Sequence, residues 1–272
     1  ALWRAAVFLN KKSWDESRQE FLLGAISIPD LPPELVVDFQ IMSAKAAFYS
    51  GELSGVELEL ESIDPEQATP EQISEGKLLL GKSRMLAGDR LGALDILKEV
   101  IDENFLPTWA EAQVEYTNLR YSDGIIDASQ AIDELERLLY VWRGGEFELF
   151  LLKSLHKLYI ENEYYRGAMT SLRTIKNAFK GSSESENAET DLEKLFLKLY
   201  LDGDSQKMPP VAALALYNDF SELTPDGKLG DQVINQLADR LISVDLLEQA
   251  AQLLNYQVSF RLKGEEKSNF YK

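Results

Sequence analysis

The sequence contains no cysteine among its 272 residues. This absence excludes disulfides, a thiolate nucleophile, and zinc or iron–sulfur sites with cysteine ligands. The only histidine is His156, so a metal site would have to be built from carboxylates. We therefore expect no metal site and no cofactor, and we interpret His156 as a surface or partly buried helix residue.

Long apolar runs and positive charge are also scarce. The longest apolar candidates, residues 5–9 and 78–80, are far shorter than the roughly 18–20 residues that span a bilayer, so no transmembrane segment is expected. There are 28 Lys and Arg against 46 Asp and Glu, a net charge of -18. Nucleic-acid binders usually present a basic face because phosphate neutralisation supplies much of their affinity. The charge balance therefore argues against nucleic acid or an anionic membrane as a partner.

Apolar residues recur at three- and four-residue steps nearly throughout, which is typical of helices. Residues 90–103 place four of them on one stripe: Leu91, Leu94, Leu97 and Ile101. Proline marks helix starts and glycine marks helix ends. The pattern predicts an all-α protein of about fourteen helices with no convincing strand.

Three segments share a helix–turn–helix pattern: residues 44–56, 81–93 and 155–167. In each, a turn residue is followed five positions later by a small residue that opens a second helix; the pairs are Gly51 with Val56, Gly88 with Ala93, and Asn162 with Gly167. Turns of this kind recur every 35 to 42 residues, near Lys12, Gly51, Gly88, Asp123, Asn162, Asp204 and Asp245. Repetition at this period predicts an α-solenoid, in which stacked helix pairs bury their apolar faces on one another.

We expect residues 1–272 to form a single array. The first residues already resemble the middle of a helix and residues 260–272 resemble the start of another unit, so we interpret the chain as a piece of a longer polypeptide. Residues 180–190 are polar and lack apolar anchors, which predicts a long loop inside the array or, alternatively, a boundary within it.

These residues resemble the tetratricopeptide repeat (TPR) family. The family pattern of a Leu-Gly pair, a small residue and a later Leu is matched by Leu80-Gly81 with Ala93 and Leu97. Two other sets also match: Ala44, Val56 and Leu60, and Ala238, Ala250 and Leu254. The chain departs from the family at Arg84, where tyrosine is usual, and in a period longer than 34 residues. The resemblance implies a right-handed superhelix of antiparallel helix pairs that binds proteins and is not an enzyme.

Residues 213–225 and 236–251 resemble large uncharacterised TPR proteins of alphaproteobacteria. This second resemblance implies a bacterial protein and leaves the cytoplasm and the periplasm both open. A targeting signal, if the full protein has one, would lie outside this fragment.

One stretch matches a catalytic-looking motif. Gly76, Gly81, Lys82 and Ser83 fit the phosphate-binding loop G-x-x-x-x-G-K-[ST], which wraps backbone N–H groups around phosphates between a strand and a helix. Here the preceding residues 69–75 form a helix start rather than a strand. Gly81 also falls on the small position where two paired helices approach. We therefore interpret the match as part of a packed helix.

In the TPR family the first helix of each pair lines a concave groove. Carried over by position, this geometry predicts groove residues on two successive units: Asp38, Ile41, Lys45 and Tyr49, then Glu75, Leu78, Lys82 and Met85. Lys45 and Lys82 occupy equivalent positions and would form a basic row for a peptide's carboxylates. The competing interpretation, which we favour, is that both lysines balance neighbouring acids. Glu57, Glu59 and Glu61 are interpreted as a solvated face.

The sequence therefore predicts a scaffold that binds a peptide or protein in its groove. Two alternatives stay open: a regulatory or structural arm of a larger enzyme or envelope assembly, and a nucleotide-binding protein that uses residues 76–83. Self-association through exposed array ends is also expected. No feature of the sequence names the partner.

Overall fold

The computed structural model describes residues 1–256, and the chain divides into two compact units. Unit 1 is Ala1–Ser154, and unit 2 begins at Leu155. The described residues form fourteen α-helices and three short 3-10 helices and contain no strand. The predicted all-α class and the predicted number of helices are confirmed. Among these helices, none combines the length and the apolar character needed to cross a membrane.

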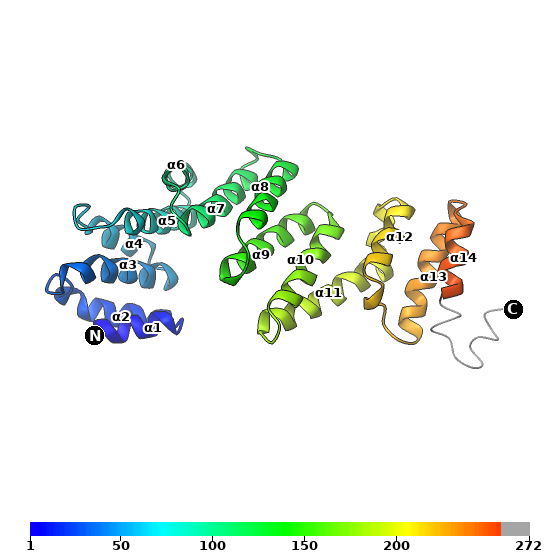
Figure 1. The fold of residues 1–272 in the computed structure, drawn as a ribbon, viewed down its shortest axis with the longest axis horizontal. Helices are drawn as coiled ribbons and strands as arrows, with labels where there is room; N and C mark the ends of the chain where they lie inside the picture. Colours follow the sequence, from blue (N-terminus) through cyan, green and yellow to red (C-terminus); the bar gives the residue numbers. More distant parts are fainter. Residues whose placement is uncertain (257–272) are drawn as a thin grey trace. The chain divides into compact units, whose positions relative to one another are not determined.

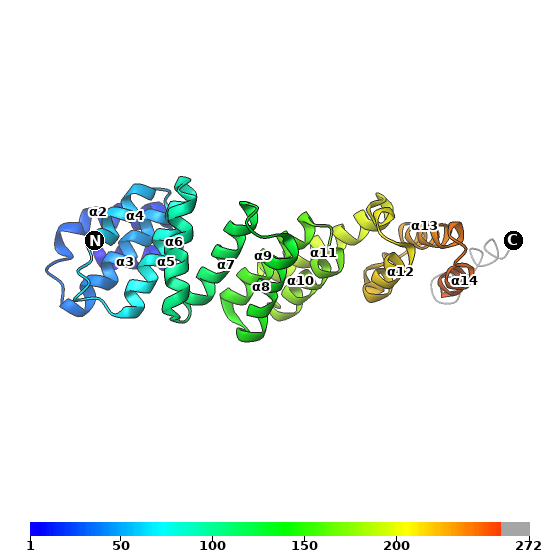
Figure 2. The same ribbon diagram turned by 90° about the horizontal axis from the view of Figure 1, so that it is seen from above.

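Unit 1 is a stack of helix pairs, and each helix packs chiefly against its neighbours in the chain (Figures 1 and 2). Its helices are α1 (Leu2–Asn10), α2 (Trp14–Gly24), α3 (Pro33–Tyr49), α4 (Leu53–Glu61), α5 (Pro70–Ala87), α6 (Arg90–Glu103), α7 (Thr108–Ser122), α8 (Ala128–Val141) and the first part of α9 (Gly145–Glu161). A 3-10 turn over Ala25–Ser27 follows α2. In addition, the first helices of successive pairs contact one another: α1 with α3, α3 with α5, and α5 with α7.

Unit 2 continues the pattern of paired helices with more interruptions. Its helices are the end of α9, α10 (Tyr165–Ala178), α11 (Ser183–Leu201), α12 (Pro210–Asp219), α13 (Lys228–Ser243) and α14 (Leu247–Tyr256). Short 3-10 helices, Asp204–Lys207 and Ser221–Leu223, lie on either side of α12. Proline at the first position of α12 suits a helix start. An N–H at this position would have no intrahelical partner, so the lack of an N–H in proline removes no hydrogen bond.

The turns between helices lie where the sequence predicts them. Lys12, Gly51, Gly88 and Asp245 all adopt the left-handed backbone that lets the chain reverse. At the other three predicted turns the left-handed residue is an immediate neighbour: Gly124, Glu163 and Gly203. The repeat inferred from turn spacing is therefore present in the structure.

Small residues sit where paired helices approach most closely. Ala44, Val56 and Ala93 are all 0% exposed. A Cβ atom on Gly81 would lie 3.0 Å from the Leu97 side chain, and one on Gly167 would lie 2.7 Å from the Tyr159 ring. These contacts confirm the predicted pattern of a turn followed by a small residue.

The apolar stripe predicted for residues 90–103 is wrong at Leu91, which is 77% exposed. Leu97 is buried, Leu94 and Ile101 pack against the same core, and α6 also buries Ala93 and Val100. A row at three-residue steps drifts around the helix, so Leu91 and Leu97 lie about 120° apart at 3.6 residues per turn. The buried row follows the three- and four-residue steps that keep to one face.

The loop predicted over residues 180–190 is also wrong, because α11 begins at Ser183. The Ser182 hydroxyl accepts a hydrogen bond from the Ser185 amide (3.2 Å), which caps the helix, and Glu184 and Glu186 in the first turn suit its positive end. Ala188 is buried on the opposite side of a largely polar turn. The two compact units divide at Ser154 and Leu155 rather than inside this stretch. Residues 260–272, expected to open another unit, lie outside the described residues.

Candidate functional site

The first helices α3, α5 and α7 form the face on which the sequence predicts a binding groove. Lys45 of α3 donates to Glu75 of α5 at 2.5 Å, and Lys82 of α5 donates to Glu111 of α7 at 2.6 Å. The two pairs join positions 30 and 29 residues apart, so they are equivalent contacts in successive repeats. Both lysines are thus paired with neighbouring acids, as in the favoured interpretation.

The other predicted groove residues lie in different environments: some are in the core, one is hydrogen-bonded between helices, and one is exposed. Ile41 and Leu78 are 3% and 7% exposed, so they belong to the core and do not line a groove. Asp38 accepts a hydrogen bond from Gln72, and Met85 packs against the core of α5, α6 and α7. Tyr49 is 47% exposed and stacks on Trp14, so it is the most accessible large side chain of the set.

Lys82 lies in a small charged cluster that is mostly shielded from water. Its ammonium is 2.6 Å from Glu111 and 3.9 Å from Glu115, and it lies 5.7 Å from the centre of the Phe48 ring. Burial alone would lower the pKa of Lys82, but the attraction of Glu111 and Glu115 outweighs it and raises that pKa. Burial raises the pKa of the Glu115 carboxyl, and Lys82 opposes that shift. The ammonium is therefore engaged by its own chain.

The phosphate-loop match is wholly helical. Helix α5 starts at Pro70 with a capping box, in which Thr69 and Gln72 each accept from the other's backbone N–H, and it continues to Ala87. The amides of residues 76–83 bond within this helix and cannot curl around a phosphate. Gly81 serves the close approach to Leu97 described above. The interpretation of this motif as a packed helix holds.

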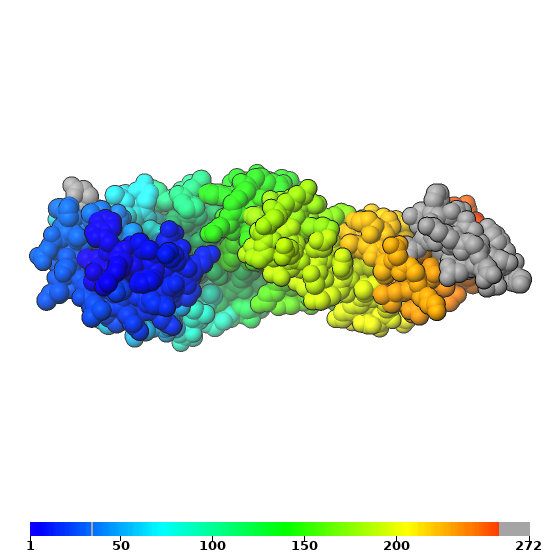
Figure 3. All heavy atoms as spheres, turned by 90° about the horizontal axis from the view of Figure 1, so that it is seen from below, coloured from blue at the N-terminus to red at the C-terminus, as the bar shows by residue number. Residues whose placement is uncertain are grey.

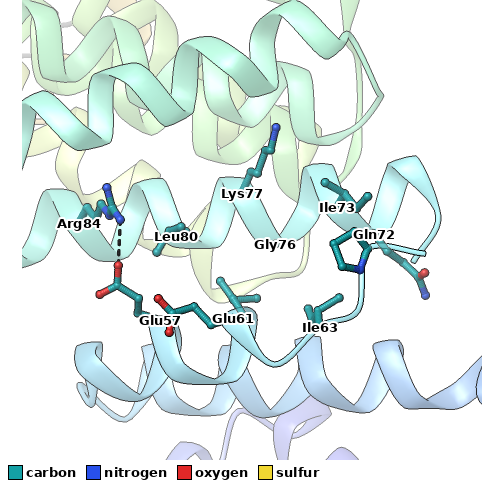
Figure 4. Close-up of a pocket in the computed structure, with 11 residues that line it drawn as sticks. Glu57, Glu61, Ile63, Gln72, Ile73, Gly76, Lys77, Leu80 and Arg84 are labelled. Carbon is teal, nitrogen blue, oxygen red and sulfur yellow. Dashed lines mark hydrogen bonds and ion pairs between the residues drawn. The ribbon is translucent and has the colours of Figure 1, made fainter. Parts of the chain in front are cut away.

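A pocket opens between α4 and α5, with a cavity volume of about 250 Å³ (Figure 4). Its apolar walls are four half-buried side chains, Leu60 and Ile63 from α4 and the loop after it, and Ile73 and Leu80 from α5. Gly76 lies between Ile73 and Leu80, and a Cβ atom there would be 3.4 Å from Leu60. A glycine at this position therefore leaves the wall of the α4–α5 pocket open.

Charged side chains surround the α4–α5 pocket. Arg84 donates to Glu57 at 2.8 Å across its mouth, whereas Lys77 points away from α4 in Figure 4. Lys77 is held by Glu103 at 2.7 Å and Glu99 at 2.9 Å, both on α6. Glu61 is exposed at the rim and has no ion-pair partner among residues 1–256.

The side chains that could ligate a metal are dispersed over the described residues. No group of three or more potential metal ligands occurs within residues 1–256. His156 is partly buried, as expected, and its Nδ1 lies 3.1 Å from the carbonyl oxygen of Ala168 on α10. The histidine therefore joins two helices.

Sequence reasoning missed two features of unit 1. Arg18 is only 7% exposed, and it donates to Glu52 at 2.8 Å, Glu59 at 2.9 Å and Ser43 at 3.4 Å. Glu59 is therefore part of a buried network rather than of a solvated face. The α4–α5 pocket was also missed, although a glycine inside a helical pattern, as at Gly76, is a sequence signal that the position has a packing or functional reason.

No family model matches the chain, and no curated protein matches it. Among solved structures, the C-terminal part of a TPR repeat-containing protein from Cytophaga hutchinsonii aligns over 100% of both chains at 12% identity, with a TM-score of 0.52. The chain has a TPR-like fold. A tetratricopeptide repeat protein from Parabacteroides merdae aligns over 99% of this chain and 95% of its own at 13% identity, with a TM-score of 0.46. A structure of nearly identical TPR-like repeats of a putative kinesin light chain from Podosopora anserina aligns over 65% of this chain and 92% of its own. The identity is 17% and the TM-score is 0.47.

The TPR-like resemblance drawn from the sequence is thus confirmed at the level of the fold. The identities are too low to carry over what these relatives bind. The resemblance to alphaproteobacterial proteins stays a prediction.

Proposed function

We propose that this TPR-like chain is a non-enzymatic scaffold that binds a segment of a partner protein on unit 1. The observation that carries the proposal is the α4–α5 pocket, where four aliphatic side chains stay half-exposed beside a helical glycine. Apolar surface of this kind is a favourable place for a partner's side chain because contact removes it from water. Helical repeats also offer rigid grooves between neighbouring helices.

The first-helix face is the second surface for the same function. Its lysines are neutralised by Glu75 and Glu111, so charge attraction to a peptide's carboxylates no longer supports it. Exposed Tyr49 still gives it one large side chain for a contact. We therefore place the main contact at the α4–α5 pocket and treat the face of Asp38, Lys45, Tyr49, Glu75, Lys82 and Met85 as the rival site.

Site-specific photo-crosslinking in source cells distinguishes the two surfaces. One variant carries a photoreactive phenylalanine at Pro65, on the pocket rim, and another carries it at Tyr49. A third, at Tyr140, which is 83% exposed, controls for random collisions. We expect a discrete protein adduct from position 65 only. An adduct from position 49 alone would move the site to the first-helix face, and no adduct above the position-140 background would contradict the scaffold function.

Nucleotide binding is expected to fail a direct test. Mg-ATP should leave the melting temperature unchanged in the wild type and in Lys82→Ala, because α5 holds the amides of residues 76–83 in its own hydrogen bonds. Binding at a hundredfold excess over the dissociation constant would stabilise the protein by about 2.7 kcal/mol. A shift of that size would revive the nucleotide alternative.

A further inference from the structure

We propose that the α4–α5 pocket binds one large apolar side chain of the partner, and that lysine or arginine lies next to that side chain in the partner's sequence. This inference rests on the proposed scaffold function and adds the chemistry of the bound segment.

The size of the pocket indicates a single side chain. Its volume of about 250 Å³ lies below the roughly 300–1,000 Å³ of sites for drug-sized molecules. Leu60, Ile63, Ile73 and Leu80 offer aliphatic contacts, and no polar group projects from Gly76 at the wall. A leucine, methionine or phenylalanine side chain satisfies these conditions.

The charges around the pocket indicate the neighbouring residue. Arg84 is engaged by Glu57 at 2.8 Å and Asp89 at 3.7 Å, and Lys77 is engaged by Glu99 and Glu103. Both cations of the pocket lining are thus engaged by acids, of which only Glu57 also lines the pocket, and Glu61 at the rim adds a negative charge without an ion-pair partner in the described chain. The local field is negative, like the net charge of -18, so a basic flank is the complementary one.

Three variants of the full chain separate the apolar contact from the charge. Gly76→Leu fills the pocket with the chain's own side chain and should weaken binding roughly tenfold to a hundredfold, the worth of burying one large apolar side chain. Gly76→Ala is its matched control, because a Cβ atom there makes only an ordinary contact at 3.4 Å from Leu60. Glu61→Gln removes the rim charge without changing shape and should weaken basic-flanked peptides about two- to fivefold.

The probe is a displayed random peptide library, selected on the wild-type chain and then titrated as synthetic peptides against each variant. Circular dichroism confirms that all variants are folded. The expected result is a selected motif of one large apolar residue beside Lys or Arg. Its binding should be weakened roughly tenfold to a hundredfold in Gly76→Leu, kept in Gly76→Ala, and reduced in Glu61→Gln with a weaker dependence on salt.

Other outcomes overturn the inference in distinguishable ways. Selected peptides that bind Gly76→Leu as well as the wild type would place the site elsewhere and leave the scaffold function standing. Peptides that require the pocket but show no basic flank, or an acidic one, would refute the charge argument alone. If no peptide is selected and photo-crosslinking from positions 65 and 49 also captures nothing above background, the scaffold function itself fails.

Discussion

The first helices of unit 1 and the α11–α12 region of unit 2 add different contacts to their apolar cores. In unit 1, polar pairs bridge successive first helices: Asp38 with Gln72, Lys45 with Glu75, and Lys82 with Glu111. In unit 2, aromatic rings pack together, with Phe196 4.9 Å from Tyr200 and Tyr200 5.8 Å from Tyr217 between ring centres. Unit 1 should therefore respond to changes of charge, and unit 2 to changes of volume.

The largest effect is expected from Phe196→Ala in unit 2. Phe196 is 0% exposed, so the change removes a buried ring and leaves a cavity between Tyr200 and Tyr217. We expect the free energy of unfolding to fall by about 3–5 kcal/mol. Urea unfolding followed by far-ultraviolet circular dichroism measures this. Phe196→Leu is the matched control and should cost less than half as much; a loss below about 1 kcal/mol for the alanine variant would break the comparison.

The next largest effect is expected from Arg18→Ala in unit 1. Its loss leaves Glu59, which is 19% exposed, without its cation. We expect a loss of about 3 kcal/mol, at the low end for broken buried pairs because Glu52 is half exposed. All four tryptophans lie within residues 1–154, so tryptophan fluorescence reports this unfolding in unit 1.

Two controls accompany this variant. Arg4→Ala removes the exposed pair with Glu20 at 2.9 Å and should cost less than about 1 kcal/mol. Arg18→Met keeps apolar bulk at the site, and a loss equal to that of Arg18→Ala would show that the unpaired charge rather than the packing sets the cost.

The sequence is enough to predict the helices, their turns and the small contact positions. Gly88 and Ala93 could be assigned because a turn and the contact after it depend on residues close in sequence. Lys82 could be placed beside an acid in general terms, since acids outnumber cations throughout. Its actual partners, Glu111 and Glu115, lie 29 and 33 positions away, and only the stacking of α5 on α7 brings them together.

The features that sequence could not reach depend on contacts across several helices. Arg18 is buried by Glu52 and Glu59, 34 and 41 residues away, whereas an isolated arginine is normally a surface residue. The α4–α5 pocket depends on how the connection after Glu61 places Ile63 and Pro65 beside α5, and local periodicity does not encode that placement. The helical start at Ser183 was missed because the polar composition of residues 180–190 predicts a loop, and the serine that caps the helix was not taken into account.

A smaller effect compares the close helix contacts of the two units. In unit 2, a Cβ atom on Gly167 would lie 2.7 Å from the buried Tyr159 ring, so Gly167→Ala should destabilise the protein by about 1–2 kcal/mol. In unit 1, the corresponding distance from Gly81 to Leu97 is 3.0 Å, and the gain of about 1 kcal/mol in helix propensity offsets the tighter contact. Gly81→Ala should therefore be near neutral by urea unfolding. Equal losses in both variants would show that the two contacts are equally tight.

The smallest effect is the pH response of the Lys82 cluster. Burial raises the pKa of Glu115 in the folded state above its ordinary 4.5. At pH values between the ordinary pKa and the raised pKa, the folded state therefore binds more protons than the unfolded state. Stability from this group therefore falls as the pH rises above about 4.5. Glu115→Gln removes the response and should be more stable than the wild type at pH 7, by less than about 1 kcal/mol, because the attraction to Lys82 at 3.9 Å is lost too.

Urea unfolding of Glu115→Gln and the wild type at pH 4.5 and pH 7, followed by tryptophan fluorescence, measures this difference. The advantage of the variant should shrink at the lower pH, because the raised pKa of Glu115 favours its neutral form in the folded wild type there. Phe196→Leu serves as the control from unit 2. Burial raises the pKa of Tyr200, so this ring beside Phe196 stays neutral over this range and the cost of that variant should not change with pH. The opposite result would be a stability difference between Glu115→Gln and the wild type that favours the wild type more at pH 7 than at pH 4.5. It would mean that the carboxylate stabilises the first-helix face by its attraction to Lys82.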